Sequence, residues 1–304
     1  GYEQQRAEGR WGDKHIDDVD EDTGEIVAEK TVPIAKSENM GSAMTIDEKQ
    51  IGRKMYTVMT NQNSGRIALV AETLKPVELR RTLENYFEDH LGEVHSVSCD
   101  MSASYIKLIK DVFPTARVVI DKFHVITHLM DALRQVRGQI KTQLLNEAKL
   151  KSESVDSRDL PWTDAEMVER SRYILCRAES QWDEDEIRQM HYLFKKFPML
   201  ETAYRLTQKL RSWYDQKNVG SDLDIRERDL YDWCDDVNQS RIASFRGVKK
   251  LIEKNHDDII NYFREGKTNA RAENMNGKIQ RFIANNFGIR NRDFFMFRLA
   301  GYFS

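Results

Sequence analysis

Two stretches decide the fold, VSCDMS at residues 97–102 and VVIDKFHV at residues 118–125. Each is a short apolar run, rich in β-branched residues, that contains or ends on an aspartate. A buried strand of this kind delivers its last residues to the carboxyl edge of a sheet, where ligands bind in α/β proteins. A third run, AMTIDE at residues 43–48, lies upstream. The sequence therefore predicts that two or three strand-borne aspartates converge.

Converging carboxylates repel one another unless a cation neutralises them. A site that offers only oxygen ligands favours Mg²⁺ or Mn²⁺ over zinc. The first hypothesis from the residues is thus a metal-dependent enzyme that acts on phosphate.

The composition favours a soluble, intracellular protein. The chain has 304 residues, 40% of them hydrophobic, which is enough for one large domain or two ordinary ones. No apolar run approaches the length of about 18 residues that a membrane span needs, and no apolar leader opens the chain. Cys99, Cys176 and Cys234 form no CxxC pair, so neither a disulfide framework nor a zinc module is expected.

Charge is distributed unevenly along the chain. Residues 1–41 hold eleven Asp/Glu and five Lys/Arg, whereas residues 264–304 hold eight Lys/Arg and three Asp/Glu. The acidic segment 1–41 has little apolar periodicity, and we expect a linker or weakly ordered arm there. The basic end is where a phosphate backbone would bind.

The segment 42–125 alternates short strands with amphipathic helices. The predicted strands are 44–47, 54–60, 66–71, 94–99 and 117–120, with helices from Lys75-Pro76 and over 103–112 between the later ones. This order predicts an α/β fold, a mixed five-stranded sheet with helices on its faces. Charged amphipathic helices dominate from residue 124 onward, and no further strand is needed. They are predicted at 124–151, 163–178, 183–196, 197–214, 222–237, 240–254, 255–265, 268–285 and 291–303.

Asp47 and Asp100 become neighbours if the first and fourth strands pair, which is the ribonuclease-H-like arrangement. Such a site commonly requires one more carboxylate from a later helix. The segment 268–281 offers Glu273, flanked by amides and cations that suit a DNA strand.

Five features together resemble the DDE transposases of bacterial insertion sequences, and within them the ISL-three family. They are Asp-Met-Ser at 100–102, Phe-Pro-X-Ala at 113–116, Asp-Lys-Phe-His-Val at 121–125, Arg137, and Ala-Glu-X-X-Asn at 272–276. The resemblance covers residues 42–150 and 265–303. Between these two parts, the helical stretch resembles the family only in position and character.

The resemblance implies that Asp47, Asp100 and Glu273 are the catalytic residues and the metal ligands. They lie 53 and 173 positions apart. The second gap is too long for a simple ribonuclease-H-like core. It implies an all-helical insertion at 126–264 between the first part of the core, 42–125, and a carboxy-terminal part, 265–304, that carries the glutamate. Two Mg²⁺ or Mn²⁺ ions about 3.5–4 Å apart would promote in-line attack on a phosphodiester.

The activity implied is that of a transposase catalytic domain, which cuts DNA at insertion-sequence ends and joins the released 3′-hydroxyl to target DNA. A homo-oligomer on DNA and a cytoplasmic, nucleoid-associated location are expected from the same resemblance. The alternatives are a ribonuclease-H-like nuclease or resolvase that does not join strands, and a decayed or domesticated transposase that only binds DNA. The zinc module and helix-turn-helix that usually precede the catalytic domain are not present in this sequence, which suggests a catalytic fragment or truncated copy.

Each proposed residue also has a simpler interpretation. Asp47 could cap a turn, with Glu48 as the true ligand, and Asp100 could cap the following helix. Asp121 could likewise be an N-cap and His124 a packed ring, so these two are site-adjacent candidates.

The candidates for DNA binding are Lys122, Asn269, Asn276, Lys278 and Arg281. Lys122 could instead be a solvated residue of a first helical turn. The final apolar run at 294–303 could stack on bases, but its helical spacing favours a place in the core.

Overall fold

The computed structural model describes residues 1–7, 14–19, 26–150, 162–264, 270–286 and 291–303. Its side chains are described over these ranges except at 14–19, 26–30, 150, 216 and 270–276. The chain divides into two compact units, one formed by Gly1–Asp121 with Asp257–Ser304 and the other by Lys122–His256. Most of α10 (His256–Arg264), which the sequence assigns to the helical insertion, groups with the first unit.

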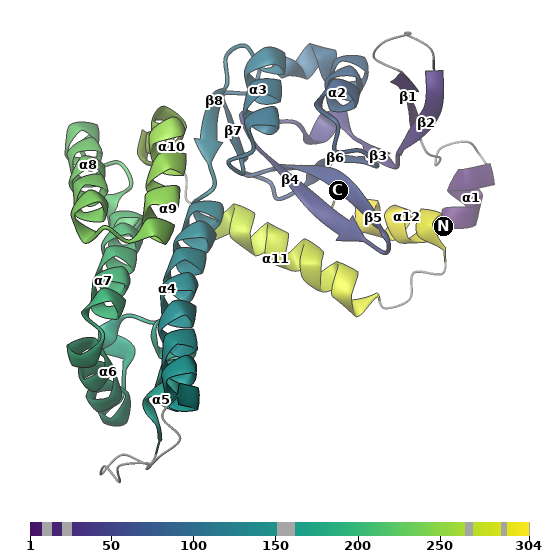
Figure 1. Cartoon of the computed structure of the whole chain (residues 1–304). Coiled ribbons are helices and arrows are strands. Elements are labelled where there is room, and N and C mark those ends of the chain that lie inside the picture. The colour runs from purple at the N-terminus through teal and green to yellow at the C-terminus, as the bar shows by residue number, and fades with distance from the viewer. Residues whose placement is uncertain (8–13, 20–25, 151–161, 265–269, 287–290, 304) are drawn as a thin grey trace. The chain divides into compact units, whose positions relative to one another are not determined.

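In the first unit, the described residues form a six-stranded sheet with the order β3-β6-β5-β4-β7-β8 (Figure 1). The strands are β3 (Ile34–Ala35), β4 (Ala43–Ile51), β5 (Lys54–Asn61), β6 (Ile67–Ala71), β7 (Ser96–Cys99) and β8 (Arg117–Ile120). The pairs from β3 to β4 are antiparallel, and β4, β7 and β8 run parallel. This order and these directions are those of a ribonuclease-H-like sheet, so the predicted α/β fold is confirmed, with β3 as an additional edge strand.

Helices cover both faces of the sheet. Figure 1 shows α2 (Pro76–Leu91) and α3 (Ala103–Val112) on one side and α11 (Ala270–Asn285) and α12 (Arg292–Tyr302) on the other. On α2, Leu79, Leu83 and Phe87 are buried at helical spacing. Pro76 at the first position of this helix explains where it begins, since proline fits there without losing a hydrogen bond.

The second face has its own core, which includes residues from β4, β5, β6, α11 and α12. Ile279 of α11 is fully buried there, together with Phe295 and Leu299 of α12. The phenyl ring of Phe282 lies 5.6 Å from that of Phe295. Burial of Phe295, Met296, Leu299, Ala300 and Phe303 is consistent with the predicted core role of the carboxy-terminal apolar run.

The described residues before position 42, where a linker or arm was expected, contain secondary structure. They form α1 (Tyr2–Ala7), the antiparallel pair β1 (Lys14–Val19) and β2 (Ile26–Val32), β3, and the short 3-10 helix Ser37–Asn39. Arg292 at the start of α12 connects this segment to the sheet through hydrogen bonds and an ion pair. Its guanidinium donates to the Tyr56 hydroxyl at 3.0 Å and to the hydroxyl of Thr31 on β2. It also lies 3.3 Å from the Glu72 carboxylate, which accepts a hydrogen bond from Thr31.

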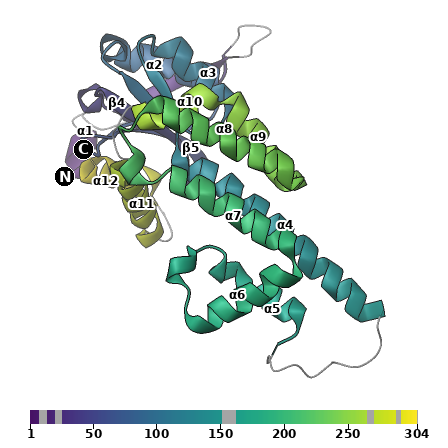
Figure 2. The same ribbon diagram turned by 90° about the vertical axis from the view of Figure 1, so that its left-hand side faces the viewer.

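The second unit is helical over its described residues. Its helices are α4 (Lys122–Leu150), α5 (Asp164–Ile174), α6 (Glu184–Lys196), α7 (Pro198–Trp213), α8 (Leu223–Ser240) and α9 (Ala243–Lys254), with 3-10 turns at Glu179–Gln181 and Gln216–Asn218. Helix α4 packs on α5, α7 and α9, and Figure 2 shows α4 and α7 running side by side. Trp182, Phe194 and Tyr204 form an aromatic cluster in which the rings of Trp182 and Tyr204 are 5.1 Å apart.

Local sequence explains where several of these helices start. The Thr163 hydroxyl accepts a hydrogen bond from the backbone N–H of Glu166, and the Thr163 N–H donates to the Glu166 carboxylate in a capping box. Asp183 forms the same arrangement with Glu186. Within the described part of the chain, no helix is both long and apolar enough to cross a membrane.

Replacing Ile279 with alanine is expected to lower the free energy of unfolding by about 2–5 kcal/mol, because a cavity replaces a fully buried side chain between α11 and the sheet. Denaturant unfolding measures this loss. Val77→Ala on the exposed face of α2 is the control and should change stability little. An Ile279→Ala protein as stable as the control would contradict the packing of α11 on this core.

Candidate active site

The register of the parallel strands places three aspartates in one row across the sheet. Thr45 on β4 lies opposite Ser98 on β7, so the same register extended by two residues sets Asp47 opposite Asp100. Cys99 lies opposite Ile120 on β8, and the next residues are Asp100 and Asp121. The backbone N–H of Asp121 still donates to the carbonyl of Cys99 at 2.8 Å, so the ladder continues beyond the strand.

The two faces of β4 distinguish Asp47 from Glu48. Asp47 pairs with Val58, which belongs to the core that contains Ile279 of α11. Because directly paired residues share a face and successive residues alternate, Asp47 lies on the α11 face and Glu48 on the opposite one. Glu48 pairs with Thr57, whose hydroxyl lies 3.1 Å from that of Tyr105 on α3.

The carboxylate of Asp47 is held by two donors from its own strand. The backbone N–H of Glu48 donates to Oδ1 at 2.8 Å, and the Lys49 ammonium lies 2.5 Å from Oδ2. Lys49 lies on the same face as Asp47, two residues further along, and its side chain is only 9% exposed. A buried ammonium requires a counter-ion, and Asp47 supplies it. Lys49 was not among the predicted site residues, although its position two residues after Asp47 on a strand indicates that the two share a face.

Asp100 lies at the turn between β7 and α3. Its Oδ1 accepts a hydrogen bond from the backbone N–H of Ser102 at 2.9 Å, which fixes the carboxyl group at the start of the helix. Among the described residues its other oxygen has no hydrogen-bond donor. The N-cap residue of α3 is Ser102, so the capping interpretation of Asp100 is wrong, and the second oxygen of its carboxylate is available to a ligand.

The pKa of the Cys99 thiol reflects the negative charge that surrounds it. Burial raises the pKa of its thiol, and the carboxylates of Asp100, Asp258 and Asp121 raise it further. The thiol thus stays protonated and packs as a small apolar side chain.

Asp121 directly precedes α4, whose first turn contains the other site-adjacent candidate, His124, and the DNA-binding candidate Lys122. Lys122 and His124 are both partly exposed. The imidazole of His124 packs edge-on against the ring of Phe123 at 5.7 Å, while Phe123 itself is 61% exposed. His124 therefore has a ring partner within its own helical turn.

Helix α10 fixes the outer edge of the parallel strands. The amide of Asn261, which is buried, donates to the carbonyl of Val118 on β8 at 2.9 Å. On the same helix, Asp258 accepts a hydrogen bond from Lys110 of α3 at 3.1 Å. These contacts bring the chain back to the sheet a few residues before α11.

The structure places the remaining candidates on α11 or outside the described residues. Glu273 and Asn276 lie on α11 in the part whose side chains are not described, and Asn269 lies outside the described residues. Lys278 and Arg281 are exposed on the same helix. Arg281 donates to the carbonyl of Gly277 at 3.2 Å, and neither cation has an acidic partner among the described residues.

The donor chemistry at this edge fits a hard divalent cation, because the candidate ligands are carboxylates. In the part of the chain whose side chains are described, no group of three His, Cys, Asp or Glu residues is placed to hold a metal ion. Asp47 and Asp100 alone are thus an incomplete set, and the third predicted ligand, Glu273, falls outside that part.

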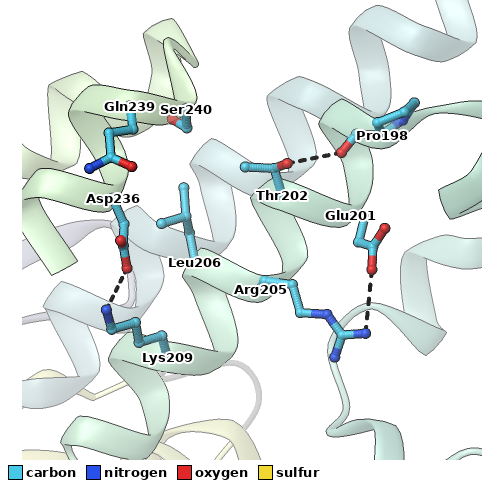
Figure 3. Close-up of a pocket in the computed structure, with 9 residues that line it drawn as sticks. All are labelled: Pro198, Glu201, Thr202, Arg205, Leu206, Lys209, Asp236, Gln239 and Ser240. Carbon is cyan, nitrogen blue, oxygen red and sulfur yellow. Dashed lines mark hydrogen bonds and ion pairs between the residues drawn. The ribbon is translucent and has the colours of Figure 1, made fainter. Parts of the chain in front are cut away.

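The groove between α7 and α8 is a separate feature of the helical unit (Figure 3). It is lined by Pro198, Glu201, Thr202, Arg205, Leu206, Lys209, Asp236, Gln239 and Ser240. Its cations are neutralised within the groove, since Lys209 pairs with Asp236 and Arg205 with Glu201. This groove therefore offers little free positive charge to a phosphate.

Arg137, one of the residues in the family resemblance, has a structural role inside the helical unit. From α4, it donates to the carbonyl of Val168 at 3.2 Å and to the carboxylate of Glu169 at 2.9 Å, both on α5. Lys141 on α4 also binds Glu169, at 3.0 Å. The hydrogen bonds from Arg137 and Lys141 hold the pKa of Glu169 at about 2.

The strand order and the aspartate row belong to the class of ribonuclease-H-like proteins. A family model described as a transposase, DDE_Tnp_ISL3, matches residues 44–299. The chain belongs to this DDE transposase family, which confirms the predicted resemblance. It is also similar to the transposase for insertion sequence element IS1001 of Bordetella parapertussis, with 22% identity over 234 residues, 75% of this chain and 53% of that protein. The chain spans about half the length of this curated relative.

Replacing Glu169 with glutamine is expected to destabilise the protein at neutral pH by no more than about 1 kcal/mol, since the ion pair is partly exposed. The native pKa is depressed, so the stabilisation is present above the ordinary glutamate pKa of 4.5 and is lost as the pH falls toward 2. Urea unfolding of both proteins between pH 7 and pH 2 tests this. Glu88→Gln, at an exposed position, is the control. If the difference in stability between Glu169→Gln and the wild type did not depend on pH, the ion pair of Arg137 with Glu169 would not contribute as described.

Proposed function

We propose that this chain is the catalytic region of a DDE transposase that cleaves DNA and joins the released 3′ end to a second DNA molecule. The observation that carries the proposal is the row formed by Asp47 in the middle of β4 and Asp100 directly after the parallel strand β7, on the face against which α11 packs. Membership of the transposase family supports it. Glu273 is proposed as the third carboxylate, because it lies on α11.

In this proposal Asp47, Asp100 and Glu273 would hold Mg²⁺ or Mn²⁺. The bound ions would activate water or a 3′-hydroxyl as the nucleophile and stabilise the leaving oxygen of an in-line displacement. The chain contributes orientation. The N–H groups of Glu48 and Ser102 each fix one oxygen of an aspartate, so the two carboxylates need little rearrangement to bind a cation.

DNA is the proposed substrate, and α11 is proposed to contact it. Lys278 and Arg281 are solvent-exposed cations on the helix that carries Glu273. Cations beside a carboxylate site attract the phosphate backbone, which the acidic ligands alone would repel. We also propose that the residues that directly follow strand β8 lie beside the substrate. They are Asp121, Lys122 and His124.

Asp47→Asn is expected to reduce metal-dependent DNA cleavage by about 10³-fold or more, since it removes a ligand charge worth several kcal/mol in the transition state. Glu48→Gln is the matched control, because its side chain lies on the opposite face of the sheet and should leave cleavage within a few fold of the wild type. The measurement is nicking of a supercoiled plasmid, and joining of a labelled 3′-hydroxyl oligonucleotide into it, with Mg²⁺ or Mn²⁺.

The products separate the possible activities. Joined products that require both Asp47 and Asp100 would support a transposase. Cleavage without joining would instead indicate a nuclease or resolvase, and metal-independent DNA binding without either product would indicate a protein that only binds DNA. Equal loss in Glu48→Gln and Asp47→Asn would overturn the assignment of the metal site to the α11 face.

Replacing Lys49 with methionine is expected to increase the affinity for Mn²⁺ by about tenfold or more, because the ammonium now beside Asp47 opposes the approach of another cation. Titration of Mn²⁺, followed by the electron paramagnetic resonance signal of the free ion, measures this without DNA. Lys49→Arg keeps the charge and should retain the wild-type affinity. Unchanged or weaker Mn²⁺ binding in a folded Lys49→Met protein would show that Lys49 does not compete for Asp47.

A further inference from the structure

Helix α9 carries a row of exposed cations in the helical unit. Arg246, Lys250 and Lys254 occupy every fourth position and are all exposed. Residues at this spacing lie one above the other on a single helix face. No ion pair or hydrogen bond joins their side chains to any residue in the described part of the chain.

The opposite face of α9 is fixed by packing. Phe245, Val248 and Ile252 are buried, and the hydroxyl of Ser244 donates to the carbonyl of Ala132 on α4 at 3.1 Å. This packing leaves the cation row turned toward solvent. The nearest acidic residue on the helix, Glu253, is already paired with Lys249 at 2.6 Å.

Positive charge is concentrated at this helix and not spread over the unit. Residues 241–254 hold five Lys/Arg and one Asp/Glu, whereas residues 122–240 hold 19 Lys/Arg and 22 Asp/Glu. Many cations in the earlier segment are neutralised by neighbours, as Arg188 is by Asp185 and Lys209 by Asp236. The α9 row therefore provides a local positive surface on a unit whose other charges nearly balance.

Gly247 is a second, independent feature of the same face. It is exposed in the second turn of α9, and a Cβ atom added to it would meet nothing within 4 Å. Glycine inside a helix costs about 1 kcal/mol relative to alanine, and here neither packing nor a positive φ requires it. Its absence of a side chain leaves the surface low beside the cation row, which permits close approach of another backbone.

We infer that the exposed face of α9, formed by Arg246, Gly247, Lys250 and Lys254, binds the sugar-phosphate backbone of duplex DNA. This inference rests on the proposed function, which makes DNA the substrate. The three cations span about 12 Å along the helix axis, at about 6 Å per four residues. Along one strand of DNA, phosphates follow each other at about 3.4 Å of axial rise, so about 12 Å covers about three to four such steps and each of the three cations has a phosphate within the span. Such contacts position DNA without reading its sequence.

The test is the salt dependence of DNA binding by the full chain. The triple variant Arg246→Gln, Lys250→Gln, Lys254→Gln is compared with wild type by fluorescence anisotropy on a short duplex of arbitrary sequence, in EDTA at increasing KCl. Each phosphate contact contributes about 0.9 to the slope of log K against log salt, so the slope should fall by about 2.7. DNA binding in EDTA does not depend on the metal site. A negative result in this binding test is therefore distinguishable from a failure of the proposed catalysis.

A charge-matched control comes from the same unit. Arg188→Gln, Arg205→Gln, Lys209→Gln also removes three positive charges, but each of these cations is paired with an acidic residue. Its slope should remain that of the wild type. Gly247→Glu is a further variant that favours the helix and adds a negative charge in open space, and it should weaken binding without lowering the melting temperature.

Three results would overturn the inference. They are an unchanged slope in the folded α9 triple variant, an equal fall in the paired-cation control, and the absence of DNA binding by the wild type. If the α9 triple variant has a lower melting temperature than the wild type, Gly247→Glu is the deciding variant. Wild-type affinity for DNA in Gly247→Glu would exclude a close phosphate contact at this face.

Discussion

The parallel pairing of β4 with β7 is the constraint on which the rest of the site depends. It aligns Thr45 with Ser98 and so brings Asp47 opposite Asp100, although the two residues are 53 positions apart in the sequence. Side chains alternate along a strand, so a slip of one residue in β4 would move Asp47 to the α3 face and Glu48 to the α11 face. The antiparallel pairing of β4 with β5 prevents this slip, because its register runs over eight residue pairs, from Met44 to Ile51.

This edge also shows how the protein holds neighbouring carboxylates before any cation is bound. Two ionised aspartates on adjacent strands repel each other, and burial strengthens that repulsion. Each is compensated locally, Asp47 by the Glu48 N–H and the Lys49 ammonium, and Asp100 by the Ser102 N–H. In the proposed function Lys49 would therefore have opposite effects on two states, since it would stabilise the metal-free fold and compete with a divalent ion for the same carboxylate.

The strands and helices that form the core were predictable because each carries a local pattern. The β-branched runs that end at Cys99 and Ile120 are four-residue strands, and the helical spacing of Leu79 and Leu83 reappears in α2. The two-residue strand β3 has no such pattern, because its pairing with β6 depends on residues 34 and 36 positions away. Local sequence also left Asp47 and Glu48 as alternatives. Only the cross-strand partners Val58 and Thr57 assign each of them to a face.

The entropy of loop closure explains how the sheet unit accommodates a long helical unit between Asp100 and α11. The entropy of closing a chain segment grows only with the logarithm of its length, by about 0.6 kcal/mol for each doubling, so a large insertion costs little more than a short one. The inserted helices also have a core of their own around Trp182 and Tyr204. The chain must return to the β8 edge of the sheet after the insertion. The hydrogen bond from the Asn261 amide to the carbonyl of Val118 on β8 fixes this return. The position of α11 then depends on that bond and on the burial of Ile279, both within the first unit.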